Sequence, residues 1–170
     1  MTTHSATRHY NVLFLCTGNS ARSILAEALL NKLGAGRFTA YSAGSHPTGT
    51  VQPLAQALAA ELGYDMHKLR SKSWDEFAAP DAPRMDFILT VCDNAAGETC
   101  PLWPGHPATA HWGIPDPAAV TGDEATRRAA YRDALLRLRQ RIELLLALPD
   151  EKLQGLAARD ALQAIAAATR

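Results

Sequence analysis

Short apolar runs recur along the chain and predict the strands of a sheet. Tyr10 to Cys16 (YNVLFLC) and Met85 to Cys92 (MDFILTVC) are rich in Val, Leu and Ile, as buried strands are. Phe38 to Ala43 predicts a further strand, and His111 to Ile114 predicts a short last one. The first run ends at Thr17-Gly18-Asn19, a turn-forming sequence, so a tight loop is expected there.

The segments between these runs have helical spacing. One helix is expected from Ser20 to the glycines at 34–36, with an apolar stripe of Leu25, Leu29 and Leu33. A second is expected over Val51 to Leu62, and a long one from about Gly122 to Leu148 with an arginine-rich, solvated outer face. Alternating strands and helices favour an α/β fold. We therefore predict a three-layer α/β/α arrangement with a four-stranded parallel sheet.

One domain is expected to occupy residues 9–148. Pro149 ends the long helix, and Lys152 to Thr169 predicts an additional Ala-rich helix, so residues 149–170 are expected to be a helical extension of unknown role. Residues 1–8 are polar and are expected to fray. No apolar run approaches the roughly 18 residues that a membrane span requires.

Composition excludes some classes of partner. The 170 residues are 47% hydrophobic and carry 17 basic and 17 acidic side chains, so no overall field would attract nucleic acid or an anionic membrane. Three cysteines without a recognisable signal peptide favour the reducing cytoplasm, where thiols are more often reactive than structural. We expect a cytoplasmic monomer.

The loop after the first strand has the features of an anion site with a thiol at its base. Cys16 ends the strand, Gly18 allows the backbone to turn its amides inward, and the next helix points its N-terminus at the same place. Arg22 is spaced to bring its guanidinium back over this loop. The expected anion-binding residues are Thr17, Gly18, Asn19, Ser20, Ala21, Arg22 and Ser23. The alternative is a buried cysteine with an arginine at a coincidental distance.

Cys16 is predicted to be a nucleophile. A helix N-terminus and a nearby guanidinium depress the pKa of a cysteine, so a thiolate is expected at neutral pH. Ser20 or Ser23 could donate a hydroxyl hydrogen bond to it. Asn19 is expected to bridge loop backbone groups or to take a left-handed conformation.

The loop sequence LFLCTGNSARS resembles the active-site loop of the low-molecular-weight tyrosine phosphatase fold. Within that fold, YSAG (41–44), TVCDNAAGETCP (90–101) and HWGIPDPA (111–118) resemble the phosphatase-like arsenate reductases more than the phosphatases. The resemblance runs from about Asn11 to Leu148. It implies reduction of arsenate to arsenite in arsenic detoxification.

Asp116 is the candidate general acid. Pro117 keeps it out of the helical region, and a poised carboxylic acid could protonate a leaving oxygen. By itself an Asp-Pro pair is more often an ordinary helix-entry turn, but the resemblance implies the acid role. Ala118 and Ala119 stand where the tyrosine phosphatases usually have a ring-stacking aromatic residue. A small inorganic oxyanion would not need that ring.

Cys92 and Cys100 require an explanation beyond phosphatase chemistry. Cys92 ends a predicted strand and so is expected at the same sheet edge as Cys16. Cys100 lies eight residues later, and a Cys92–Cys100 disulfide would need that segment to loop, with Gly97 as a possible turn. The resemblance implies a thiol relay from Cys16 through Cys92 to Cys100. Alternatively, Cys92 is a core thiol and Cys100 a surface one.

The relay needs an external reductant and no bound cofactor. The resemblance implies thioredoxin as the usual donor, with glutaredoxin or a low-molecular-weight thiol as the alternative. No metal site is expected, because the chain has no Cys-x-x-Cys and no closely paired histidines.

Two other functions stay open. One is a low-molecular-weight protein tyrosine phosphatase or small phosphomonoester hydrolase that uses the same loop. The other is an oxyanion-binding or redox-sensing module without turnover, although a sensor would not need Asp116 as an acid.

One branch of the resembled reductases binds potassium through residues that match Asn19, Glu27 and Ser42. Arg70-Ser71-Lys72 departs from that branch, which supplies a hydroxyl and a carboxylate there. We expect the Lys72 ammonium to replace the cation. Otherwise Glu27 would be an exposed helix residue.

Overall fold

The computed structural model describes residues 8–92, 103 and 107–169, with the exception of the Leu156 side chain. Its sheet has four strands in the order β2-β1-β3-β4, and every neighbouring pair is parallel. The strands are β1 (Tyr10–Cys16), β2 (Phe38–Gly44), β3 (Phe87–Thr90) and β4 (Ala108–His111). The predicted four-stranded parallel sheet is confirmed.

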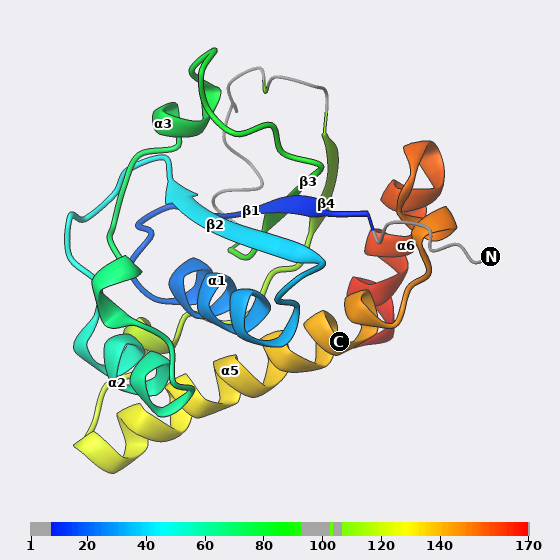
Figure 1. Cartoon of the computed structure of the whole chain (residues 1–170). Coiled ribbons are helices and arrows are strands. Elements are labelled where there is room, and N and C mark those ends of the chain that lie inside the picture. The colour runs from blue at the N-terminus through cyan, green and yellow to red at the C-terminus, as the bar shows by residue number, and fades with distance from the viewer. Residues whose placement is uncertain (1–7, 93–102, 104–106, 170) are drawn as a thin grey trace.

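Helices cover both faces of this sheet, as Figure 1 shows. The helices α1, α2 and α5 lie on one side, and the short α3 lies on the other. The helices are α1 (Arg22–Leu33), α2 (Pro53–Glu61), α3 (Asp75–Ala78), α5 (Glu124–Leu146) and α6 (Gly155–Ala168), with short 3₁₀ turns at 66–68, 117–119 and 150–153. The α/β/α class is therefore confirmed, although α3 covers far less of the sheet than the opposite layer.

The last strand lies earlier than its apolar residues predict. It spans Ala108–His111, whereas the sequence favoured His111 to Ile114. Beyond His111 the chain still follows β3, because Ile114 N–H donates to the Val91 carbonyl at 3.2 Å. Pro115 has no N–H to continue the ladder. The segment therefore leaves the sheet as a loop that leads to Asp116.

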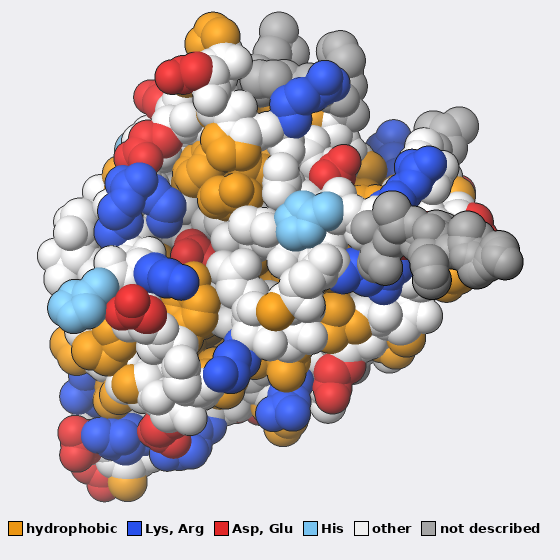
Figure 2. Space-filling view, in the orientation of Figure 1, with side chains coloured by type: hydrophobic (Ala, Val, Ile, Leu, Met, Phe, Trp, Pro, Cys, Tyr) orange, Lys and Arg blue, Asp and Glu red, His pale blue; other side chains and the backbone are white. Residues whose placement is uncertain are grey.

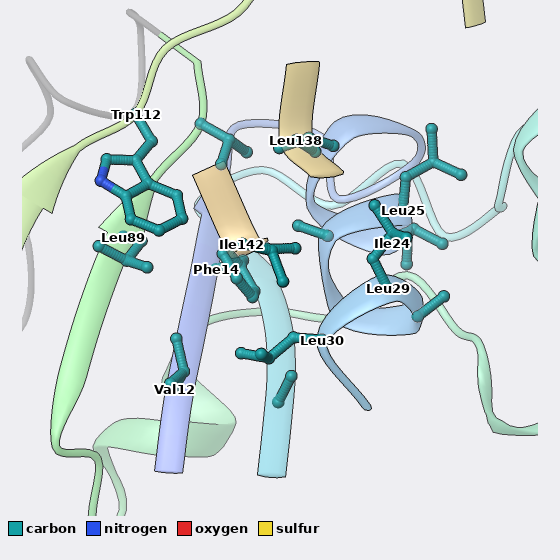
Figure 3. Packing of buried hydrophobic residues seen from close by; sticks show 14 of the residues in the cluster. Val12, Phe14, Ile24, Leu25, Leu29, Leu30, Leu89, Trp112, Leu138 and Ile142 are labelled. Atoms are coloured by element: carbon teal, nitrogen blue, oxygen red, sulfur yellow. The ribbon is translucent and has the colours of Figure 1, made fainter. Parts of the chain in front are cut away.

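The larger core lies between the sheet and the α1/α5 layer (Figure 3). Phe14 of β1 and Trp112 pack with ring centroids 6.4 Å apart, and Leu138 and Ile142 of α5 are completely buried against the same cluster. The helix α1 is buried on nearly all sides from Ser23 to Leu30. The predicted single stripe on α1 is wrong at its end, because Leu33 is 37% exposed.

A smaller core covers the opposite face of the sheet. Leu13 and Leu15 of β1 point there, together with Ile88 of β3, and they pack under Phe77 of α3. Successive residues of β1 thus face opposite layers, since side chains alternate along a strand. Both faces of β1 are buried, which explains why its sequence is apolar without alternation.

The surface in Figure 2 shows basic and acidic side chains interspersed, in keeping with equal numbers of each in the sequence. Among the described residues, no helix is long and apolar enough to cross a membrane.

Candidate active site

The loop that follows β1 is held open by hydrogen bonds to its carbonyl groups. The N–H groups of His46, Thr48 and Gln52 donate to the carbonyls of Thr17, Gly18 and Ser20 at 2.9, 3.1 and 2.9 Å. The segment after β2 therefore draws the loop carbonyls away from Cys16. Because a peptide N–H points away from its own carbonyl, the loop N–H groups face the other way, as an anion cradle requires.

Gly44 allows this loop to lie directly beside the end of β2. It is paired with Cys16 in the strand register. A Cβ atom at this position would lie 2.4 Å from the Thr17 carbonyl oxygen and 2.9 Å from that of Cys16. Only glycine fits such an approach. In the sequence, Gly44 was part of the YSAG segment that carried the family resemblance, and its packing against the loop was not predicted.

Asn19 takes the left-handed conformation expected of it, whereas its side chain bonds a hydroxyl and a distant segment instead of backbone groups of its own loop. Its φ of 46° is left-handed, and its side chain bridges two segments, with Nδ2 donating to Ser23 Oγ at 2.8 Å and Oδ1 accepting from Lys72 N–H at 2.9 Å. Both Asn19 and Ser23 are completely buried. Ser23 thus supports the loop from below, and none of the hydrogen bonds of the described residues joins Ser20 or Ser23 to Cys16.

Cys92 lies against the same loop. Its Sγ accepts a hydrogen bond from Thr17 N–H at 3.2 Å and lies 3.6 Å from Thr17 Oγ1. Cys16 and Cys92 are both buried, and no disulfide joins the two. The predicted position of Cys92 at the same sheet edge as Cys16 is therefore what the structure shows.

The expected thiolate at Cys16 is wrong for this arrangement. Its hydrogen bond with Cys92 and its burial raise the pKa of Cys16, and they outweigh the Arg22 charge and the Gly18 N–H, which lower it. Burial disfavours a charge on sulfur, and a hydrogen bond in which the Cys16 thiol is the donor favours its neutral form. The helix N-terminus and the guanidinium, from which a thiolate was predicted, do not offset these two effects. Cys16 is held as a thiol at neutral pH.

Arg22 connects the loop to the segment after β4. Its Nη1 donates to the Ile114 carbonyl at 3.0 Å, and its Nη2 lies 3.6 Å from Asp116 Oδ2. Its side chain is only 14% exposed, and the buried Nε has no hydrogen-bond partner within the part of the chain that the structure describes. A buried guanidinium N–H without a partner is an available donor for an oxyanion.

Asp116 reaches the site from the loop after β4. Its Oδ1 accepts from Ala118 N–H at 3.0 Å, which fixes the carboxyl at the start of the 117–119 turn, and its side chain remains 41% exposed. Burial and the nearby Asp116 charge raise the pKa of Tyr131, so this phenol stays protonated. The structure therefore brings together Cys16, Arg22, Cys92 and Asp116. Cys100 lies outside the described residues.

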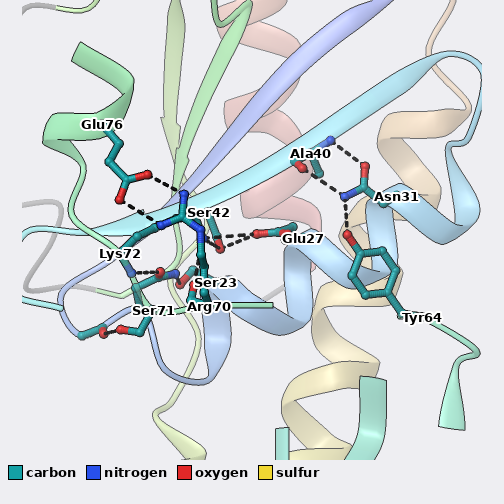
Figure 4. A network of polar contacts seen from close by, with 12 residues as sticks. Ser23, Glu27, Asn31, Ala40, Ser42, Tyr64, Arg70, Ser71, Lys72 and Glu76 are labelled. Atoms are coloured by element: carbon teal, nitrogen blue, oxygen red, sulfur yellow. Dashed lines mark hydrogen bonds and ion pairs between the residues drawn. The ribbon is translucent and has the colours of Figure 1, made fainter. Parts of the chain in front are cut away.

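The Lys72 ammonium occupies the position expected of it (Figure 4). Its Nζ lies 3.7 Å from Glu27 Oε1 and donates to Ser42 Oγ at 3.4 Å and to the Arg70 carbonyl at 2.9 Å. Ser42 donates to Glu27 Oε1 at 2.6 Å. Burial raises the pKa of Glu27 and lowers that of Lys72. Glu27 is buried, so it is not the exposed helix residue of the alternative reading.

Metal ligands do not gather in the described residues, where no group of three or more His, Cys, Asp and Glu side chains comes together.

The residues of this site lie in a region of the chain that matches a known protein family. The sequence pattern of low molecular weight phosphotyrosine protein phosphatase matches residues 11–156, which include the Cys16 loop and Asp116. The chain belongs to this family. The match ends within the first turn of α6.

Arsenate reductases are among the proteins that this chain resembles. The arsenate reductase of Halalkalibacterium halodurans is 36% identical over 121 residues, which cover 71% of this chain and 84% of that protein. The crystal structure of arsenate reductase from Archaeoglobus fulgidus has a TM-score of 0.62 at 34% identity and covers 81% of this chain and 99% of its own. The thioredoxin-dependent arsenate reductase of Corynebacterium glutamicum has a TM-score of 0.55 at 25% identity, over 83% of this chain and 65% of its own.

Proposed function

We propose that this chain is an arsenate reductase that converts arsenate to arsenite in arsenic detoxification. The observation that carries the proposal is the second thiol: Cys92 Sγ accepts a hydrogen bond from Thr17, the residue after Cys16. Hydrolysis of a phosphoester needs one cysteine, whereas a second thiol at the same loop can remove the first from a covalent adduct as a disulfide.

The reaction starts with arsenate in the cradle formed by the loop N–H groups and Arg22. The arsenate dianion takes the proton of Cys16, whose raised pKa keeps it a thiol until then. The thiolate attacks arsenic and forms an S–As bond. The departing As–O group takes a proton from Asp116 and leaves as water, a step in which a general acid contributes about 10² to 10⁴ in rate.

Electrons move in the second step. Cys92 gives its thiol proton to an arsenic-bound oxygen and its sulfur attacks Cys16 Sγ, so that an S–S bond forms and the S–As electron pair stays on arsenic, which leaves as arsenite. Two thiols are thereby oxidised and arsenic is reduced by two electrons. Cys100 then attacks Cys92, which regenerates Cys16 and leaves a Cys92–Cys100 disulfide for an external thiol to reduce.

The electron donor that we propose is thioredoxin, with glutaredoxin or a low-molecular-weight thiol as the alternative. The Corynebacterium glutamicum relative is described as thioredoxin-dependent, which supports the first choice. The relay needs no bound cofactor, because the electrons come from thiols. Reduced thiols also suit the cytoplasm.

The two residues that follow Asp116-Pro117 support a small substrate. Ala118 and Ala119 follow Asp116-Pro117 and offer no aromatic ring for a phosphotyrosine. The second candidate function is a phosphatase, which the anion cradle of this family supports by itself. It would use Cys16, Arg22 and Asp116 and would leave Cys92 without a role.

The test measures NADPH oxidation with thioredoxin and thioredoxin reductase, with and without arsenate, in the wild type and in Cys100→Ser. We expect arsenate-dependent turnover in the wild type. The Cys100→Ser variant should release one equivalent of arsenite per enzyme and then stop, and Cys92→Ser should release none.

A repeat with glutathione and glutaredoxin, or with mycothiol, identifies another donor if thioredoxin is inactive. If no thiol system supports arsenate turnover, and an aryl phosphate is hydrolysed equally well by the wild type and Cys100→Ser, the chain is a phosphatase and the proposal is wrong.

A further inference from the structure

A buried arginine contacts residues 112–116, the acid loop that carries Asp116. Arg141 belongs to α5, and although its neighbouring arginines are exposed, its own side chain is only 4% exposed. Its guanidinium donates to the carbonyls of Trp112 and Gly113, the latter at 3.1 Å, and to Thr169 Oγ1 at 3.0 Å. The solvated face predicted for this helix is therefore wrong at Arg141.

The helix α6 is joined to the same segment. The Trp112 indole N–H donates to the Leu162 carbonyl at 3.0 Å, and the Trp112 side chain is completely buried. Ala158, Leu162 and Ile165 of α6 belong to the main core. Thr169, which follows α6, also donates to the Ile165 carbonyl at 2.8 Å. Arg141 and Trp112 thus connect the C-terminal helix to the two residues that precede Ile114.

This segment carries the acid. Asp116 lies two positions after Ile114, and Arg22 binds the Ile114 carbonyl. Gly113 would make the segment flexible if its carbonyl were free. The contacts of Arg141 therefore restrict the chain at the point where the direction of Asp116 is set.

The surroundings of Arg141 do not fit an ordinary ion pair. Within the described residues its acceptors are two carbonyls and one hydroxyl, and no carboxylate lies within ion-pair distance. Burial accordingly lowers the pKa of Arg141. Burial of a guanidinium against neutral oxygens contributes little net stability. What this geometry does provide is a planar fork that holds two successive carbonyls in one orientation.

We infer that Arg141 and the C-terminal helix α6 are positioning elements for proton donation: they hold residues 112–116 so that the Asp116 carboxyl stays over the anion loop. The inference rests on the proposed role of Asp116 as general acid. Misplacement of a catalytic group by about 1 Å can cost about 10² in rate, so the loss of this support should be seen in the chemical step.

The experiment follows single-turnover arsenite release from pre-reduced enzyme over a range of pH. It compares the wild type, Asp116→Asn, Arg141→Met and Arg141→Lys. Arg139→Met serves as the matched control, because Arg139 belongs to the same helix and its side chain is 49% exposed. Inhibition by phosphate measures whether the anion cradle is intact.

For Arg141→Met we expect a rate constant about 10- to 100-fold lower, and a pH profile that changes in the same way as that of Asp116→Asn. Phosphate should bind within about threefold of the wild type, since Arg22 and the loop are retained. Arg141→Lys keeps a donor for the carbonyls and should recover part of the rate. Arg139→Met should match the wild type.

Each other result overturns the inference or the function beneath it. If Arg141→Met folds and keeps the wild-type rate and pH profile, the inference is wrong. If Asp116→Asn itself leaves both unchanged, the acid role fails and the inference fails with it. If Arg141→Met does not fold, Thr169→Val and Trp112→Phe remove one contact each. They should lower the rate about two- to tenfold, and wild-type rates in both would overturn the inference.

Discussion

The Cys92 sulfur accepts a hydrogen bond from the backbone N–H of Thr17, although 75 residues separate the two in the sequence. Thr17 follows Cys16, so this contact places the second thiol at the base of the anion loop. The neighbouring positions of β1 and β3 in the sheet make the contact possible, because both strands end at the same edge. The two thiols therefore influence each other before any substrate is bound.

Replacing Cys92 by alanine should lower the pKa of Cys16. The hydrogen bond with Cys92 is the largest cause of the raised pKa, and the Arg22 charge remains to lower it. In a Cys100→Ser background, the rate of Cys16 alkylation by iodoacetamide should reach its midpoint at a lower pH than with Cys92 present. Mass spectrometry of the alkylated peptide gives the rate. An unchanged or higher midpoint would show that Cys92 does not control Cys16.

Gly44→Ala should displace the anion loop. The new Cβ would meet backbone atoms of Cys16 and Thr17, which cannot move aside as a flexible side chain could. We expect a loss of about 1–3 kcal/mol in the free energy of unfolding and at least about a tenfold loss in kcat/KM. Urea unfolding and arsenate turnover measure the two effects.

Gly36→Ala is the control for this variant. Gly36 has a φ of 91° and open space around its Cα, so alanine there strains the backbone without a clash. It should cost about 1 kcal/mol of stability and leave turnover unchanged. A Gly44→Ala enzyme with wild-type turnover would contradict the packing argument.

Lys72→Met should leave the Glu27 carboxylate buried without its cation. The removal of one partner of a buried pair costs about 3–5 kcal/mol. Because burial already raises the pKa of Glu27, folding favours its protonated form, and the loss should grow as the pH rises through that raised pKa. Thermal unfolding of wild type and variant at pH 5 and pH 8 tests this, and an equal loss at both pH values would contradict it.

The same ammonium should make the wild-type enzyme insensitive to potassium. Lys72 Nζ already supplies the positive charge beside Glu27 and Ser42. Turnover should be equal in potassium and sodium at the same ionic strength. A clear rise in potassium alone would show that Lys72 does not replace the cation.

Asp150 should contribute to stability only above acid pH. Hydrogen bonds from Arg37 and Tyr10, each at 3.0 Å, lower the pKa of Asp150 below its ordinary value of 3.8. A carboxyl with a lowered pKa stabilises the folded protein at pH values above its pKa in the unfolded chain. This stabilisation is lost as the pH falls through its pKa in the folded protein. Asp150→Asn should therefore lower the Tm at pH 6 and have little effect near pH 2. An equal decrease at both pH values would contradict this.

The fold and the anion loop were predictable because their causes are local. The apolar runs of β1 and β3 require burial on both faces, and the residues from Cys16 to Arg22 combine a strand end, turn residues and a helix start in one short segment. The conformation of Asn19 follows from the same local chemistry, since asparagine tolerates a left-handed backbone.

The remaining features depend on contacts between distant segments. Cys92, which follows β3, raises the pKa of Cys16, and Arg141 is buried against the carbonyls of Trp112 and Gly113. Helical spacing places Arg141 three residues after Leu138 and four before Leu145, on the buried face of α5, but its charge led to the prediction that it is solvated. The strand β4 was misplaced because Ala108–His111 is less apolar than the residues after it.

The three hydrogen bonds from His46, Thr48 and Gln52 to the loop carbonyls have a consequence for the energetics of turnover. The loop amides acquire their orientation when the protein folds, so the arrival of an oxyanion does not have to order them. Binding then loses little conformational entropy. The arrangement of donors that receives arsenate is made once, during folding, and does not have to be made again in each catalytic cycle.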